Sequence, residues 1–158
     1  MTGDELQNIL DEVTKELTNK NEYADLCKEM WNYDTPKRLI KKEAEQIKRE
    51  LQLDFIVSGN EGLFYKDYII GIFQIRFFIP YKHGMIDSFY RAFKGHSDNS
   101  FPTLTFREIV QQVRDVKVDP TFSFPIIGDM NDFKKALTLI LDINNAIIDK
   151  LEKKLDNP

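Results

Sequence analysis

The side chains that could act as a general base are few in this chain. Its two histidines, His83 and His96, both lie next to glycines in stretches that read as loops. An imidazole titrates near neutral pH, but it acts as a base only with a positioned partner in a cleft. The nearest acids along the chain are Asp87 and Asp98, and such loops commonly expose a histidine that has no chemical role. We therefore expect neither histidine to be catalytic.

The single cysteine also argues against catalysis. Cys27 falls beside Leu26 and Met30 in an apolar helical pattern, where a lone cysteine is usually a small buried side chain. One cysteine excludes an intrachain disulfide and a zinc site built from several cysteines. A reducing, cytoplasmic setting is the simplest interpretation. We expect no catalytic residue, no cofactor and no metal.

One short pattern is typical of metal-dependent nucleases. Enzymes of the restriction-endonuclease type place an Asp on one strand and a Glu or Gln, followed two residues later by Lys, on the next. Asp67 with Gln74 and Arg76 faintly resembles this arrangement, but Arg stands where Lys is needed and Asp67 is expected in a turn of the same hairpin. Because such short patterns recur by accident, Gln74 and Arg76 are more simply interpreted as the solvent side of an alternating strand.

The hydrophobic periodicity changes from helical to alternating and back along the chain. Residues 1–52 read as helices, with Thr35-Pro36 as a helix start. Residues 53–93 hold 11 of the 19 aromatic residues and read as a meander of about four strands. Residues 68–79 are expected to form the strongest strand, after a tight turn or bulge at Lys66-Asp67. Residues 86–93 fit a strand or a helix.

The last third of the chain, residues 103–155, reads as helical again. Thr105 and Glu108 fit a capping box, and Asp129 stands where it would cap a long final helix. The predicted fold class is α+β: an antiparallel sheet of about four strands, flanked by N-terminal helices and a long C-terminal helix. At 158 residues the chain is expected to form a single domain.

Charge is unevenly distributed, although the net charge is only −4. Residues 1–34 hold nine acids and three bases, whereas residues 35–52 hold six bases and three acids. The simplest interpretation is two solvated helix surfaces of opposite sign. A sharper hypothesis is that the acidic N-terminal surface attracts a protein with a basic surface. The residues expected to contact that partner are acids and two aromatic anchors: Asp4, Asp11, Glu12, Glu22, Asp25, Glu29, Trp31 and Tyr33.

The alternative is a nucleic-acid-binding or hydrolytic domain with a basic, aromatic sheet face. Residues 68–95 hold four bases against one acid, and the bases are Arg76, Lys82, Arg91 and Lys94. Nearby aromatic residues that could stack on nucleic-acid bases are Tyr68, Phe78, Tyr81 and Tyr90. The isoelectric point of about 5.3 is low for such a protein. We therefore favour the interpretation that these aromatics fill the core.

Together these features predict a non-enzymatic protein-binding domain. Small acidic α+β chains without a catalytic motif are typical of bacterial immunity proteins and related inhibitors, which block a toxin by direct binding. This is a likeness of type, and no motif ties the chain to a family. No stretch approaches the roughly 20 apolar residues that cross a bilayer, so we expect no membrane contact. The sequence defines no oligomeric state.

Overall fold

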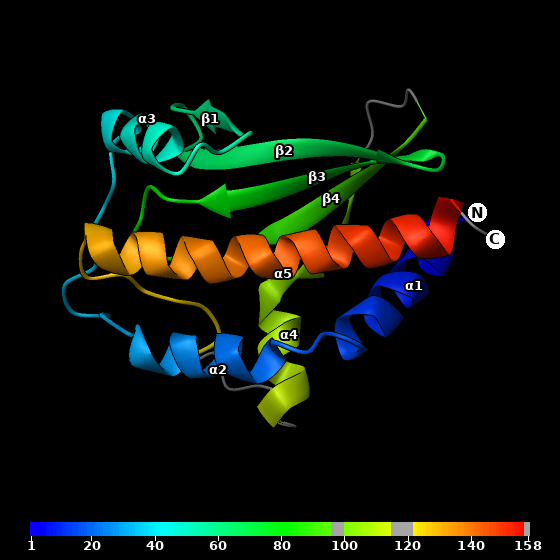
Figure 1. The fold of residues 1–158 in the computed structure, drawn as a ribbon, viewed down its shortest axis with the longest axis horizontal. Coiled ribbons are helices and arrows are strands. Elements are labelled where there is room, and N and C mark those ends of the chain that lie inside the picture. Colours follow the sequence, from blue (N-terminus) through cyan, green and yellow to red (C-terminus); the bar gives the residue numbers. More distant parts are fainter. Residues whose placement is uncertain (96–99, 115–121, 157–158) are drawn as a thin grey trace.

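The computed structural model describes residues 1–95, 100–114 and 122–156 of the chain (Figure 1). Within them the elements confirm the α+β prediction, with helices first, a sheet next and helices last. The helices are α1 (Gly3–Lys15), α2 (Lys20–Glu29), α3 (Lys41–Glu50), α4 (Phe106–Arg114) and α5 (Met130–Asp156). The strands are β1 (Ile56–Ser58), β2 (Leu63–Ile70), β3 (Phe73–Pro80), β4 (Phe89–Lys94) and β5 (Ser100–Thr105).

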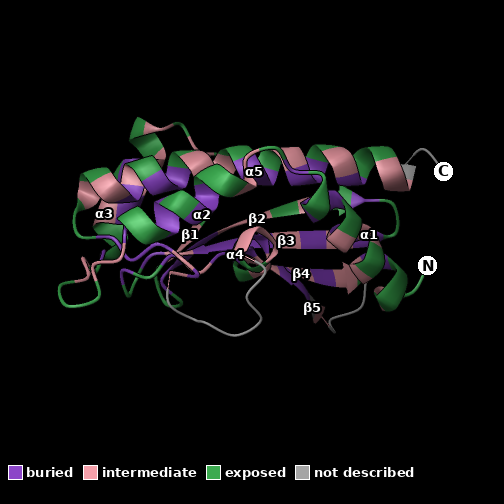
Figure 2. Ribbon diagram, turned by 90° about the horizontal axis from the view of Figure 1, so that it is seen from below, coloured by how far each residue is buried: buried purple, intermediate pink, exposed green. Residues whose placement is uncertain are grey.

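The five strands form one antiparallel meander in the order β1-β2-β3-β4-β5. On β3, Phe73, Ile75 and Phe77 are buried under helices, whereas Gln74 and Arg76 point to the other side and are half-buried. This alternation was predicted and is confirmed. Figure 2 shows α5 along one side of the sheet, and no helix of the described residues lies along the other. We call the uncovered side the open face.

Helix α5 forms the roof of the core and crosses the sheet from end to end (Figure 1). Its 27 residues span about 40 Å at the usual helical rise. Along its buried stripe lies one polar side chain, Asn144, which meets two tyrosines of the sheet. Tyr90 Oη donates to Asn144 Oδ1 at 2.8 Å, and Asn144 Nδ2 donates to Tyr68 Oη at 2.8 Å. This chain of bonds fixes the height of α5 above the strands.

Two of the predicted helix starts are confirmed and one is wrong. The backbone N–H of Asp132 donates to Asp129 Oδ1 at 2.8 Å, so Asp129 caps α5 as expected. Glu108 accepts the backbone N–H of Thr105, which forms half of the predicted capping box. Residues 35–40 are not helical, and α3 begins at Lys41. The cause is tertiary, because the N–H of Lys37 donates to the carbonyl of Ile127 at 2.8 Å.

The predicted boundaries within the sheet need correction. Strand β2 runs straight through Lys66-Asp67, and the turn lies at Gly71-Ile72, so residues 68–79 are not one strand. This turn was not predicted, because apolar residues surround it. Gly71 is its one glycine and adopts the positive φ, 60°, that the turn requires. Of residues 86–93, which fitted a strand or a helix, residues 89–93 lie in strand β4 and residues 86–88 precede it. Strand β5 extends the sheet to Thr105, beyond the predicted limit at residue 93.

Candidate binding surface

The open face carries a cluster of aromatic rings that helices do not cover. The strand register places four of these rings together: Tyr65 of β2, Phe78 of β3, and Phe89 and Phe93 of β4. Phe78 and Phe89 stack with centroids 4.7 Å apart, and Tyr65 lies 6.3 Å from Phe78. Although Phe78 points away from the helices, it is only 8% exposed. Phe78 packs against Phe89 and Tyr65, and the other three rings are half-buried, so the cluster presents an apolar surface.

Arg76 lies in the middle of this cluster. Its guanidinium carbon is 4.6 Å from the centroid of Tyr65 and 5.5 Å from that of Phe93. Its Nε and Nη2 donate to the two carboxylate oxygens of Asp67, at 2.6 and 3.0 Å. These hydrogen bonds hold the pKa of Asp67 below its usual range. A planar cation fixed between rings and a carboxylate has little freedom to lose when a partner binds.

A second arginine, Arg91, stands directly opposite Arg76 on β4. Two like charges at this spacing repel each other unless an opposite charge neutralises one of them. Arg91 Nε donates to Ser100 Oγ at 2.7 Å, while Arg76 is bound to Asp67. Asp67 therefore neutralises Arg76, whereas Arg91 is hydrogen-bonded but keeps its positive charge on the open face.

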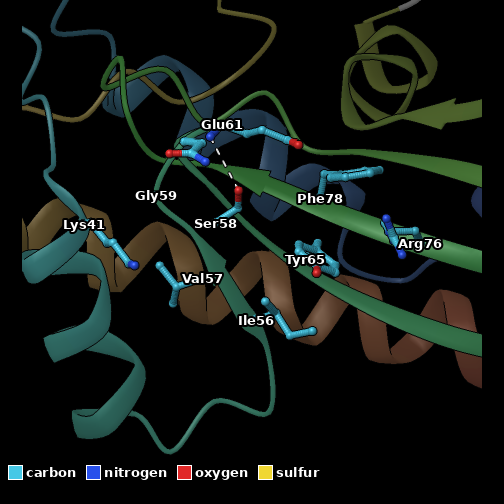
Figure 3. Close-up of a pocket in the computed structure, with 10 residues that line it drawn as sticks. Lys41, Ile56, Val57, Ser58, Gly59, Glu61, Tyr65, Arg76 and Phe78 are labelled. Carbon is cyan, nitrogen blue, oxygen red and sulfur yellow. Dashed lines mark hydrogen bonds between the residues drawn. The ribbon is translucent and has the colours of Figure 1, made fainter.

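The margins of the open face are apolar or hollow. Ile69, near the hairpin tip, is 74% exposed, and Ile56 of β1 is 53% exposed. Beside β1 lies a hollow of about 590 Å³ whose lining includes Lys41, Tyr65 and Arg76 (Figure 3). Ile56 is part of the wall of this hollow and gives it an apolar edge.

The predicted basic residues do not share one surface. Arg76 and Arg91 lie together on the open face, whereas Lys94 pairs with Phe73 in the register of the opposite, helix-covered side. Lys82 follows the end of β3 and is exposed. Of the aromatics expected beside these bases, only Phe78 faces the open side. Tyr81 and Tyr90 are buried, and Tyr68 bonds to Asn144 under α5. The preferred interpretation of these tyrosines as core residues is confirmed for Tyr81 and Tyr90.

The predicted acids lie on α1 and α2, where lysines of α5 neutralise some of them. Glu12 Oε2 lies 3.7 Å from Lys154 Nζ, and Glu29 Oε1 lies 2.8 Å from Lys135 Nζ. Asp11 accepts a hydrogen bond from the side chain of Gln7 at 3.2 Å. Glu12 and Glu29 stay exposed in these pairs, and Asp4, Glu22 and Asp25 are exposed acids that form no ion pair with another described residue.

The two predicted aromatic anchors differ in their surroundings. Trp31 is half-buried, with ring centroids 5.3 Å from Phe122 and 5.6 Å from Phe124. Its ring is therefore committed to the chain's own packing. Tyr33 is 72% exposed and stands free for a contact.

Among the described residues, the side chains considered for chemistry are not assembled into a site. His83 is exposed in the turn after β3, and Asp87 is bonded to Arg107. His96 and Asp98 lie outside the described residues. Cys27 is fully buried, and burial raises the pKa of its thiol to about 12. Among the residues that the structure describes, no three metal-binding side chains converge, and no helix could cross a membrane.

The nuclease-like pattern has a structural explanation. Asp67 lies within β2, opposite Arg76, and not in the turn that the sequence suggested. Its two oxygens are bound by the guanidinium. A carboxylate held in this way is already neutralised, so the spacing of Asp67, Gln74 and Arg76 serves a cross-strand ion pair.

Comparisons of the chain with protein-family models, with curated proteins and with solved structures give no match. Function is therefore argued from the surface alone. The sequence did not predict the grouping of Tyr65, Phe89 and Phe93 around Arg76. The alternation along β3 indicated that Arg76 faces away from the core. Predicting which residues of β2 and β4 lie beside it required the strand register, which depends on the turn at Gly71.

Proposed function

We propose that this chain is a non-enzymatic binding domain that docks another protein on the open face of its sheet. One observation carries the proposal: aromatic rings and a fixed arginine are gathered on a face that the described helices leave uncovered. Tyrosine, phenylalanine and arginine are enriched at the energetic centres of protein interfaces. Because the side chains already pack on one another, binding costs little conformational entropy.

The finer proposal is that the chain is a small inhibitor of the immunity-protein kind, which blocks a toxin or effector. The net charge of −4 and the exposed acids Asp4, Glu22 and Asp25 suit a partner with a basic surface. In this scheme the acids accelerate the encounter, and the open face supplies the affinity. Exposed charges act mainly on association rates, whereas packed aromatics act mainly on dissociation.

The test begins with affinity capture from the cells that express the chain. Three baits are compared: the native chain, an open-face variant with Tyr65→Ala and Phe93→Ala, and an acidic-surface variant with Glu22→Lys and Asp25→Lys. We expect one protein to be retained by the native chain and lost by the open-face variant. Thermal unfolding checks that each bait is folded. A protein captured equally by all three baits would contradict the proposal.

The nucleic-acid alternative is tested on the same material. Asp67 neutralises Arg76, so Arg91 is the one uncompensated cation of this arginine pair and would neutralise few phosphates; we therefore expect no gel shift of single-stranded RNA or DNA at low salt. A shift that Arg76→Gln with Arg91→Gln abolishes would replace the proposal with nucleic-acid binding. A shift that survives both substitutions would reflect another surface.

A further inference from the structure

Strand β1 is an edge strand, so one side of its backbone is not paired with another strand of the described sheet. Within the described part of the chain it pairs with β2 alone, through Ile56, Val57 and Ser58. In an antiparallel ladder every second residue turns its N–H and C=O away from its partner strand. The outer side of β1 therefore offers hydrogen-bonding groups to a further strand, next to the exposed side chain of Ile56.

Two hollows meet at this edge. The first, of about 590 Å³, extends over the open face toward Tyr65 and Arg76 (Figure 3). The second, of about 410 Å³, lies between α3 and β1. Ile56 and Val57 contribute to the walls of both hollows, so the edge of β1 runs between them.

We infer that the edge of β1 accepts an extended acidic segment of the partner protein. Successive side chains of a strand point to opposite sides, so alternate side chains of the added segment enter the two hollows. Backbone hydrogen bonds supply affinity in this mode, and the hollows supply selectivity. The inference rests on the proposed function and deepens it, because it names the chemistry of one segment of the partner.

The acidic character follows from the charges around the second hollow, because the first is lined by Glu61 as well as by Lys41 and Arg76. Lys48 and Arg49 of α3 line the second hollow, and Glu45 is the acid beside them. Glu45 is already 3.9 Å from Lys41 Nζ, and Glu50, the next acid of α3, is bonded to Lys134. Lys48 and Arg49 are thus left to meet a carboxylate of the incoming segment.

The same charges disfavour pairing of the edge with a second copy of itself. Edge strands are protected when they are short and flanked by like charges. β1 has three residues, and the cations of α3 repel an identical edge. An acidic strand meets attraction where a copy meets repulsion, so the edge is selective.

The experiment uses the full chain and a phage library of random ten-residue peptides. We expect the selected peptides to alternate Asp or Glu with β-branched residues. The best of them is synthesised, and its affinity is measured for the native chain and for Lys48→Glu with Arg49→Glu. We expect binding to weaken by about tenfold in the variant. Lys42→Glu, on the same helix but outside both hollows, is the matched control and should bind normally.

A second measurement tests the strand pairing itself. Methylating alternate backbone nitrogens of the peptide removes the bonds of one edge without altering the protein. One of the two methylation registers should abolish binding, and the other should leave it intact. Equal binding of both methylated peptides, or equal affinity for free glutamate, would overturn the inference.

The outcomes also separate this inference from the proposed function. If no peptide binds at β1, but the captured protein still depends on Tyr65 and Phe93, the edge inference fails alone. If an acidic peptide binds at β1 and no partner depends on the open face, the proposed function fails and the edge site stands.

Discussion

Arg76 shows how a single side chain acquires its role from neighbours far along the sequence. The alternation of β3 predicted that Arg76 faces away from the core, and this is confirmed. The sequence did not predict its partners, because they depend on the register of β2 and β4. Because the turn was predicted at Lys66-Asp67, Asp67 was expected in a loop, and its ion pair with Arg76 could not be predicted.

The first prediction concerns the Asp67–Arg76 pair. Because Arg76 lowers the pKa of Asp67, the pair stabilises the folded state above the ordinary pKa of an aspartate and loses this effect as the pH falls through the lowered value. Asp67→Asn should therefore lower the free energy of unfolding by about 0.5–1 kcal/mol at neutral pH and have no effect in strong acid. Urea unfolding measures both.

Asp54→Asn is the matched control for this prediction. Asp54 lies 3.4 Å from Lys66 Nζ, but its side chain is almost fully exposed. Such a pair contributes nothing measurable in many proteins. A loss of stability as large in Asp54→Asn as in Asp67→Asn would show that the packed setting of Arg76 has no special effect.

The buried amide of Asn144 gives a second prediction at this scale. Tyr90→Phe removes the donor to Asn144 Oδ1 and leaves a buried carbonyl oxygen unpaired, which should cost about 1–3 kcal/mol of unfolding free energy. Adding Asn144→Leu removes the unpaired carbonyl oxygen, so the double variant should recover part of the lost unfolding free energy. Chemical denaturation of the four proteins in the cycle tests this, and strictly additive losses would contradict it.

Cys27 gives a third prediction. Burial holds the thiol protonated, so a thiol reagent should not label the native chain at neutral or mildly alkaline pH. Labelling should become fast in denaturant. Rapid modification of the folded protein would mean that Cys27 is accessible and reactive, against its buried position on α2.

At the scale of elements, the sequence predicted helices and strands wherever a hydrophobic periodicity continued over many residues. The stripes of α1 and α5 and the alternation of β3 emerged in this way. The failures lie where a tertiary contact or a single residue decides. Lys37 is held by Ile127 and does not join a helix, and Gly71 turns the chain inside an apolar run.

The two glycines of the hairpins should differ in their tolerance of a side chain. Both have positive φ, but a Cβ on Gly71 would lie 3.9 Å from its nearest neighbour, whereas one on Gly62 would lie 2.3 Å from Lys82 Cβ. Gly71→Ala should cost about 1 kcal/mol of unfolding free energy, from backbone conformation alone. Gly62→Ala should cost about 3 kcal/mol, because Lys82 must also move. Equal losses in denaturant unfolding would refute this difference.

At the scale of the whole molecule, the arrangement of layers could be predicted and the binding surface could not. A sequence with helices on both sides of a meander predicts a sheet with a covered face. It does not show which strand positions meet on the uncovered face, nor that α5 neutralises Glu12 and Glu29 of the acidic helices. The acids are predicted to form a contact surface, and the lysines that pair with two of them, Glu12 and Glu29, lie more than a hundred residues away along the chain.

The most direct test of the account is the affinity of the purified partner for two variants of the chain. Calorimetry with the open-face variant, Tyr65→Ala with Phe93→Ala, should show a dissociation constant at least about 30-fold weaker than that of the native chain. The acidic-surface variant, Glu22→Lys with Asp25→Lys, should lose only a few fold, mainly through slower association. Full affinity in the open-face variant, with binding lost in the acidic-surface variant, would place the interface on the helices and contradict the account.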